Sequence, residues 1–253
     1  MLVVISPAKK LNFEDPAPRK DFTTPGYLKE SQKLISALRK CKPAEIKKMM
    51  KLSDALTDLN VDRYQKFETP FSLKNAKQAI YAFQGDTYVG FDVDTMKKSD
   101  VDYAQKHLRI LSGLYGMIAP LDLIQPYRLE MGTKFSCAGK KDLYEFWKKS
   151  LISDLNKILE KEKVLVNLAS KEYFSSIDSK KVEGRIVTPV FKEKKGRDYK
   201  IVGIMAKRAR GMMSRYICEN RIKDVEKLKE FKLDNYKFSK KDSTESEFVF
   251  LRG

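Results

Sequence analysis

The 253 residues include 51 lysines and arginines against 34 aspartates and glutamates, which gives a formal net charge of +17 at pH 7. Such an excess of positive charge attracts polyanions and raises their association rate, so nucleic acid or an anionic membrane surface is the favoured partner. A membrane partner is disfavoured, because no segment approaches 18 consecutive apolar residues and the charge is spread along the chain. Apolar residues make up 42% of the sequence, and no linker or repeat divides it. We therefore expect one domain over residues 1–253.

The N-terminal segment and the cysteines indicate the cellular compartment of the protein. The apolar run Met1–Ser6 is too short for a signal peptide, and a basic segment follows it directly. Cys41, Cys137 and Cys218 are odd in number and far apart, which does not fit a disulfide framework and suits a reducing compartment. The expected location is the cytoplasm.

Several strands and helices can be predicted in chain order. Residues 2–6 form a short apolar run that predicts a buried strand, and helical periodicity covers 27–83, with Pro43 and Ser72 as breaks or caps. Helical patterns resume at Asp94 and over 141–161. Segments rich in Val and Ile predict strands at 164–169, 185–191 and 200–206, the last two joined as a hairpin around Gly196. A helix over 209–222 and a closing pair of strands at 236–238 and 247–251 complete an α/β or mixed α+β fold, in which helices surround a mixed sheet.

Residues 99–125 form a candidate helix-hairpin-helix element. Ser99 and Asp102 fit a capping box, and the apolar positions that follow lie on one helical face up to Leu111. Gly113-Leu114-Tyr115-Gly116 then permits a sharp turn whose N–H groups could bind a phosphate. The outgoing helix is restricted by Pro120 and Pro126 to a turn or two around residues 121–124. The alternative is a plain helix stop at glycine.

A second candidate for anion binding is the basic segment that begins at Lys207. At 100° per residue, one half of this helix carries cations and the other half apolar side chains. The basic positions are Lys207, Arg208, Arg210, Arg215 and Arg221, and the apolar ones are Met205, Ala209, Met212 and Tyr216. A solvated face would normally mix charge signs, whereas only Glu219 interrupts this one. Phosphate contact is the favoured interpretation, because arginine matches phosphate oxygens well.

Counting residue types argues against several enzyme classes. The one histidine, His107, rules out paired-histidine zinc sites, and the cysteines lack C-x-x-C spacing. His107 lies among polar helical residues, so we expect it to be solvated. Walker and G-x-G-x-x-G spacings are missing. Ser6-Pro7-Ala8-Lys9 matches S-x-x-K, but the serine ends a strand and the partner motifs are absent, so the match is treated as accidental. We expect no metal site and no cofactor.

Seven segments stand out in chain order: Ser6-Pro7-Ala8-Lys9, Gly85-Asp86-Thr87-Tyr88, LSGLYG, PYRLEMG, KDLYEFW at 141–147, NLASKEYF at 167–174 and the 206–217 segment. Together they resemble the bacterial YaaA family of peroxide stress resistance proteins. The resemblance covers essentially the whole chain. It implies a cytoplasmic protein that limits damage by peroxide and intracellular iron, with an α/β fold of its own, a basic cleft, a helix-hairpin-helix element and binding to duplex DNA.

The resemblance also implies which residues face the cleft. It places there Lys9, Arg109, Ser112, Gly113, Tyr115, Gly116, Arg128, Lys171, Tyr173, Lys207, Arg208, Arg210 and Arg215. Tyr115 and Tyr173 are candidates to stack on bases or to donate hydrogen bonds. Where the family is expected to carry an arginine before Pro120, this chain has Ala119, so one phosphate contact near the hairpin is expected to be missing.

Three functions are therefore compared. The leading hypothesis is a monomeric DNA-binding protein with little sequence preference, which binds duplex or distorted DNA through phosphate contacts. The second is an enzyme acting on a nucleotide or DNA base, in which Lys9 or Lys171 would work with Asp86 or Asp122. The third is a direct iron binder that uses carboxylates, for which the sequence shows no ligand set.

Overall fold

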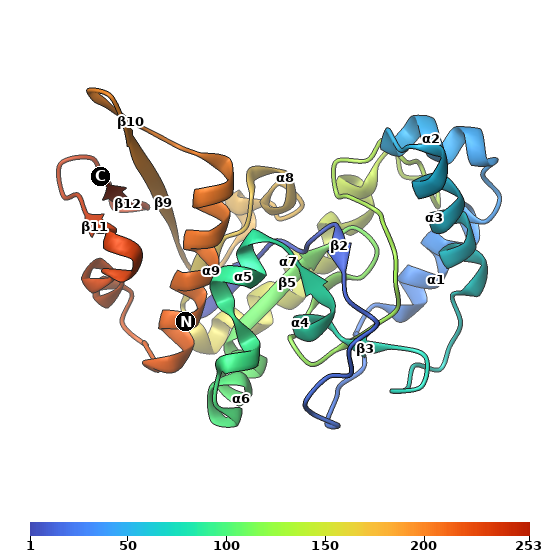
Figure 1. Ribbon diagram of the computed structural model, residues 1–253, viewed down its shortest axis with the longest axis horizontal. Coiled ribbons are helices and arrows are strands. Elements are labelled where there is room, and N and C mark those ends of the chain that lie inside the picture. The colour runs from blue at the N-terminus through green and yellow to red at the C-terminus, as the bar shows by residue number, and fades with distance from the viewer.

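A mixed sheet is the centre of the computed structural model, which describes all 253 residues (Figure 1). Its strand order is β11-β12-β9-β8-β1-β5-β6, and β10 pairs with β9 beside this path. The five strands from β12 to β5 are parallel, while β6, β10 and β11 are antiparallel additions. The strands are β1 (Leu2–Ile5), β5 (Leu108–Ser112), β6 (Gly116–Ile118), β8 (Val164–Leu168), β9 (Arg185–Lys195), β10 (Asp198–Lys200), β11 (Lys237–Phe238) and β12 (Glu247–Arg252).

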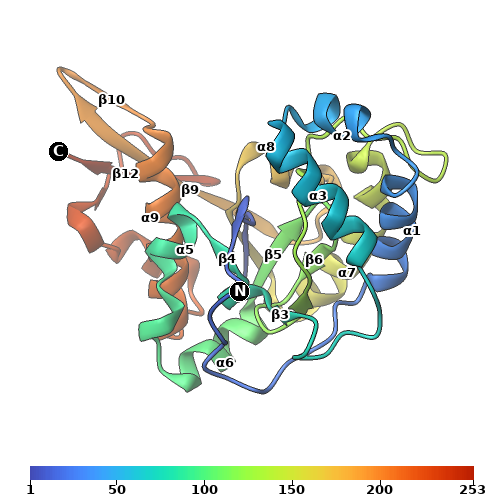
Figure 2. The same ribbon diagram turned by 45° about the vertical axis from the view of Figure 1, so that its right-hand side comes forward.

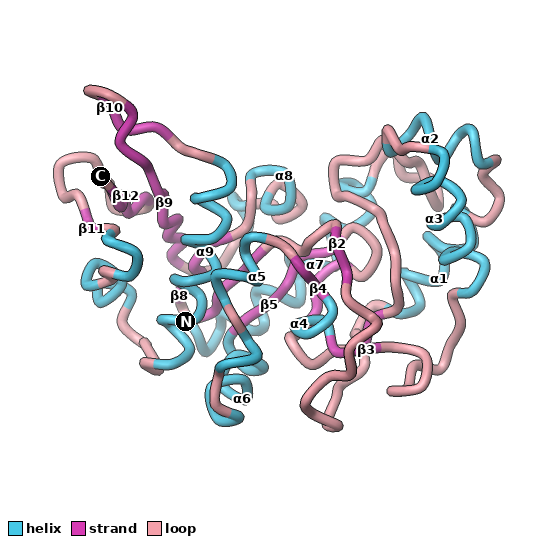
Figure 3. Tube along the Cα trace, viewed as in Figure 1, coloured by secondary structure: helices cyan, strands magenta, loops and turns pink.

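Short strands and loops connect this sheet to the rest of the chain. β2 (Lys10–Leu11) pairs with β4 (Phe83–Gln84), and β3 (Lys77–Gln78) pairs with β7 (Leu123–Ile124). Figure 3 shows that most of the chain between β2 and the first helix is loop. Each of these two small ladders is a separate sheet of two strands.

Helices cover both faces of the sheet, as expected for strands that are apolar on both sides. All four residues of β1 are buried. Figure 2 shows α9 and α5 on one side of the sheet and α7 on the other. The helices are α1 (Leu28–Leu38), α2 (Pro43–Met50), α3 (Asp54–Lys66), α4 (Ala79–Ala82), α5 (Asp86–Phe91), α6 (Lys98–His107), α7 (Leu143–Glu162), α8 (Lys171–Phe174) and α9 (Gly203–Glu219). Short 3₁₀ turns lie at Val93–Thr95, Ser179–Lys181, Val225–Glu230 and Leu233–Asn235.

Two glycines bring α5 and α9 into backbone contact. A Cβ at Gly211 of α9 would lie 1.9 Å from the carbonyl oxygen of Thr87, and one at Gly90 of α5 would lie 2.1 Å from the carbonyl oxygen of Arg208. Only glycine allows such an approach. The packing fixes the basic side chains of α9 beside the first turn of α5.

The helix-hairpin-helix prediction is wrong. α6 ends at His107, and residues 108–118 form the β5–β6 hairpin, in which Ser112 pairs with Gly116. The strand forms because β1 offers a parallel edge to which Leu108–Ile110 pair, and this tertiary pairing overrides the helical pattern. No helix follows the turn, since Leu123–Ile124 is the short strand β7.

The strand predicted at 200–206 is also wrong in most of its length. β10 ends at Lys200, and α9 begins at Gly203. The hairpin around Gly196 is confirmed, with Lys195 paired to Asp198 and a positive φ at Gly196. The closing antiparallel pair near the C-terminus is confirmed as β11 and β12. The α/β fold class with a mixed sheet and surrounding helices is confirmed.

Candidate functional site

A cavity of about 340 Å³ lies at the carboxyl ends of β1 and β8. Among the parallel strands of this sheet, the chain passes from β1 to β5 on one side of β1. From β8, which lies on the other side of β1, it continues to β9 and β12 in the opposite direction. Such a change of direction opens a crevice at the carboxyl ends of the strands, where open α/β sheets bind ligands. We call it the switch-point cavity. Its lining is Ser6–Lys10, Gln84–Tyr88, Ser170, Glu172, Tyr173, Lys207 and Arg210.

Hydrogen bonds between the loops hold the base of the cavity. The backbone N–H of Ser170 donates to Ser6 Oγ at 2.8 Å, so the residue after β1 is tied to the loop after β8. Tyr88 donates its hydroxyl to the carbonyl oxygen of Ser6 at 3.1 Å, which ties α5 to the same point. Burial raises the pKa of Tyr88 and Tyr173, so both phenols remain neutral donors. Three separate parts of the chain are thereby fixed around one space.

Helix α9 contributes the cations of the cavity wall. Lys207 and Arg210 are three residues apart, so both lie on the same helix face. Lys207 is exposed, and Arg210 is half-buried. The side chain of Arg210 forms neither an ion pair nor a hydrogen bond within the chain, and burial alone lowers its pKa. Arginine stays charged, so Arg210 is a partly desolvated cation without an anion.

Acidic groups near the cavity are partly committed to other contacts. Lys9 Nζ lies 3.0 Å from Glu130 Oε1, and Arg128 lies 3.1 Å from the same oxygen. Glu172 accepts a hydrogen bond from the backbone N–H of Gly132 at 3.0 Å. Asp86, in the first turn of α5, makes no side-chain contact of this kind. The lining as a whole carries four basic and two acidic residues, so it favours an anionic ligand.

Five predicted site residues line this cavity: Lys9, Asp86, Tyr173, Lys207 and Arg210. Lys171 follows the lining residue Ser170 but is exposed outside the cavity, as is Arg208. Arg128 is connected to Lys9 only through Glu130.

The glycine turn does not belong to the site. Ser112, Gly113, Tyr115 and Gly116 are all buried, which contradicts their predicted phosphate contacts. The turn packs against Trp147, whose Nε1 donates to the carbonyl oxygen of Gly113 at 2.9 Å. A Cβ at Gly116, where φ is +71°, would lie 2.8 Å from the Trp147 ring. These glycines therefore serve the packing of β5, β6 and α7.

Arg109 and Asp122 also have structural contacts instead of site contacts. Arg109 donates to the carbonyl oxygens of Gln105 and Leu108 at 3.0 and 2.8 Å. Asp122 is buried, accepts from the Thr23 hydroxyl at 2.5 Å and from the Ala119 N–H at 2.8 Å, and has its pKa raised by burial. Neither residue lines the switch-point cavity.

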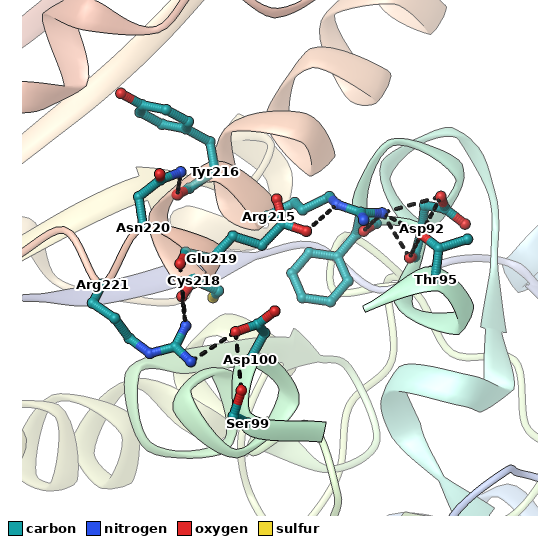
Figure 4. A network of polar contacts seen from close by, with 11 residues as sticks. Asp92, Thr95, Ser99, Asp100, Arg215, Tyr216, Cys218, Glu219, Asn220 and Arg221 are labelled. Carbon is teal, nitrogen blue, oxygen red and sulfur yellow. Dashed lines mark hydrogen bonds and ion pairs between the residues drawn. The ribbon is translucent and has the colours of Figure 1, made fainter. Parts of the chain in front are cut away.

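Arg215 connects helices instead of facing a ligand (Figure 4). It donates to Asp92 Oδ2 at 3.0 Å and to Thr95 Oγ1 at 2.7 Å, and its Nε donates to Glu219 at 2.9 Å. Arg221 lies beyond the end of α9 and pairs with Asp100 at 2.7 Å. The basic residues of the predicted helix thus have two roles: Lys207 and Arg210 line the cavity, whereas Arg215 and Arg221 form ion pairs within the protein.

His107 is not on a solvated face, contrary to expectation. It is half-buried, and its ring is stacked on Tyr103 with centroids 4.1 Å apart. Its Nδ1 lies 3.2 Å from Glu162 Oε1. Burial lowers the pKa of the ring and outweighs the attraction of Glu162. No helix is long and apolar enough to cross a membrane, and no group of three or more His, Cys, Asp or Glu side chains is arranged around a possible metal position.

The sequence prediction missed several lining residues, among them Lys10, Gln84, Thr87, Tyr88, Ser170 and Glu172. A signal for them was present, because four of the seven family-like segments meet at this cavity. These are Ser6–Lys9, Gly85–Tyr88, the end of the 167–174 segment, and α9. The remaining three segments build the β5–β6 turn, the loop after it and the start of α7.

The sequence matches known proteins over its whole length. The family model described as peroxide stress protein YaaA matches residues 1–242. The chain belongs to the YaaA family. It is 52% identical over 254 residues to a UPF0246 protein of Alteromonas mediterranea, with all of this chain and 98% of the relative covered. UPF0246 proteins of Aliivibrio fischeri and of an Azoarcus species are 47% and 50% identical, over the full chain and 98% and 99% of their own lengths. The family resemblance seen in the sequence is thereby confirmed.

Proposed function

We propose that this member of the peroxide stress family is a cytoplasmic, monomeric DNA-binding protein that contacts phosphates at and around the switch-point cavity. The observation that carries the proposal is Arg210, a half-buried guanidinium with no acidic partner, beside Lys207. A partly desolvated cation is costly unless an anion completes it. A phosphate group supplies that anion and matches the planar fork of arginine.

The surroundings of the cavity favour a polyanion over a small anion. Lys10, Lys171 and Arg208 are exposed, lie on the cavity wall or next to it in the chain, and form no ion pair. Together with Lys207 and Arg210 they offer five contacts to successive phosphates. The net charge of +17 adds a long-range attraction to DNA. Protein bound along the backbone would limit the access of iron and peroxide to the DNA, which is how we propose that it limits iron-dependent damage.

The test is a salt series of binding to duplex DNA. Five phosphate contacts predict that log K falls with log salt at a slope of roughly −4 to −5, from about −0.9 for each contact. Replacing both Lys171 and Arg208 by alanine should flatten the slope by about two units. The matched control is Lys48→Ala on α2, an exposed lysine without an ion pair on the distant group of helices in Figure 1. A slope near zero for the unmodified protein would refute DNA binding.

A further inference from the structure

We infer that the switch-point cavity binds one nucleoside 5′-phosphate unit, which deepens the DNA-binding proposal on which it rests. The unit is supplied either by a nucleotide displaced from a duplex or by a free nucleotide. A volume of about 340 Å³ falls within the range of roughly 300–1,000 Å³ that is typical of small-molecule sites. It is more space than a phosphate group needs, and it lies where open α/β sheets bind nucleotides.

The phosphate end of the unit is assigned to the α9 wall. Arg210 and Lys207 lie on one face of the helix and point to the same space. Neither has an acidic partner within the chain, so both are available to phosphate oxygens. The contact of Gly211 and Gly90 between α9 and α5 fixes where these cations stand relative to the next wall.

The sugar and base end is assigned to the wall formed by β4 and the start of α5. Gln84 and Asp86 line it, and neither side chain has a hydrogen-bond partner in the protein. An amide offers both donors and an acceptor, and a carboxylate accepts from ring N–H, amino or hydroxyl groups. The rings of Tyr88 and Tyr173 supply apolar surface between the two walls. Cations on one wall and an amide and a carboxylate on the adjoining wall match the two ends of a nucleotide, whereas inorganic phosphate would use only the first.

The experiment measures free and DNA-borne nucleotides in separate arms. Calorimetry compares deoxynucleoside 5′-monophosphates with inorganic phosphate. Fluorescence follows binding to two duplexes that each carry one 2-aminopurine nucleotide. This nucleotide is base-paired in the first duplex and unpaired, as a bulge, in the second, and its fluorescence rises when it leaves the base stack. We expect the monophosphates to bind at least about tenfold more tightly than phosphate, and the bulged duplex to bind at least about tenfold more tightly than the paired one, which is the effect of one or two additional well-made hydrogen bonds.

Two variants, with one control variant, test the assignment of the two walls of the cavity. Arg210→Gln should weaken the binding of the monophosphates and of inorganic phosphate alike and should remove the preference for the bulged duplex, while Arg208→Gln, a change of the same type at an exposed neighbour, should weaken both duplexes equally and leave the monophosphates unaffected. Asp86→Asn should change the ranking among the four bases without changing the binding of inorganic phosphate. Thermal melting of each variant establishes that it is folded.

The outcomes separate the two proposals. Binding of monophosphates without binding of any DNA would refute the DNA function and support the cavity assignment, with a free nucleotide as the source. Binding of both duplexes with equal affinity, together with monophosphates no tighter than phosphate, would overturn the cavity assignment and leave DNA binding in place. A folded Arg210→Gln protein that binds the monophosphates and the bulged duplex as tightly as the unmodified protein would also overturn it.

Discussion

The contact between α5 and α9 predicts a large effect from one methyl group. Gly211→Ala places a Cβ 1.9 Å from the carbonyl oxygen of Thr87, and the nitrogen of Phe91 lies 2.7 Å away. Both atoms belong to the backbone, so no rotamer change can relieve the overlap. The two helices must separate, and overpacking of this kind costs about 3 kcal/mol. Alanine gains about 1 kcal/mol of helix propensity, which leaves a net loss of about 2 kcal/mol in the free energy of unfolding.

The assay is thermal unfolding with a matched control in the same helix. For a chain of this size, the net loss corresponds to a fall in Tm of roughly 4–8 °C. Gly203→Ala, at the first position of α9, adds a Cβ with no atom within 4 Å and should leave Tm unchanged or slightly raised. Separation of the helices should also displace Lys207 and Arg210 and weaken anion binding. A Gly211→Ala protein that melts at or above the unmodified protein would refute the close packing of α5 on α9.

Three further predictions follow from buried groups. Arg215→Ala should lower the free energy of unfolding by about 2 kcal/mol, because it leaves Asp92 and backbone carbonyls without their donor; an unchanged Tm would contradict the scaffold role. Burial lowers the pKa of His107 in the folded protein, so below pH about 6.5 the unfolded chain binds a proton that the folded protein does not. The free energy of unfolding should therefore fall on acidification, and His107→Gln should reduce that fall. Equal pH dependence in the variant would show that other groups cause it. Burial raises the pKa of Cys218 to about 12, so a thiol reagent should modify the half-exposed Cys41 in the native protein and reach Cys218 only after unfolding, whereas equal rates would contradict the burial.

Elements set by local chemistry were predictable from the sequence. α7 was expected at 141–161 and is found at Leu143–Glu162, because Asp142 caps it and apolar residues recur every four positions. The segment after α6 was not predictable, because Leu108 and Leu111 continue the helix face of Val101 and Ala104 and also fit a buried strand. Only the edge of β1, more than a hundred residues earlier, decides between them.

The sequence indicated which segments contribute to the site, but it did not indicate where in the fold they meet. Arg210 and Arg215 look equivalent in the sequence, since both lie on the basic half of one helix. Asp92 lies more than 120 residues from Arg215 in the chain and forms an ion pair with it, whereas Arg210 has no acidic partner. The partners that distinguish a ligand contact from a structural ion pair are tertiary neighbours, which a helical projection does not contain.

The order of strands has a consequence for synthesis. β12 pairs with β9 on one side and with β11 on the other, so an interior strand of the sheet is formed by Glu247–Arg252, which are synthesised about 50 residues after the end of β9. Until then the edge of β9 is open to other chains, as unpaired edges are. Maturation of the sheet therefore waits for the synthesis of Glu247–Arg252. A nonsense codon at Glu247 would remove β12, and it should yield a nascent product that proteases and chaperones treat as unfinished.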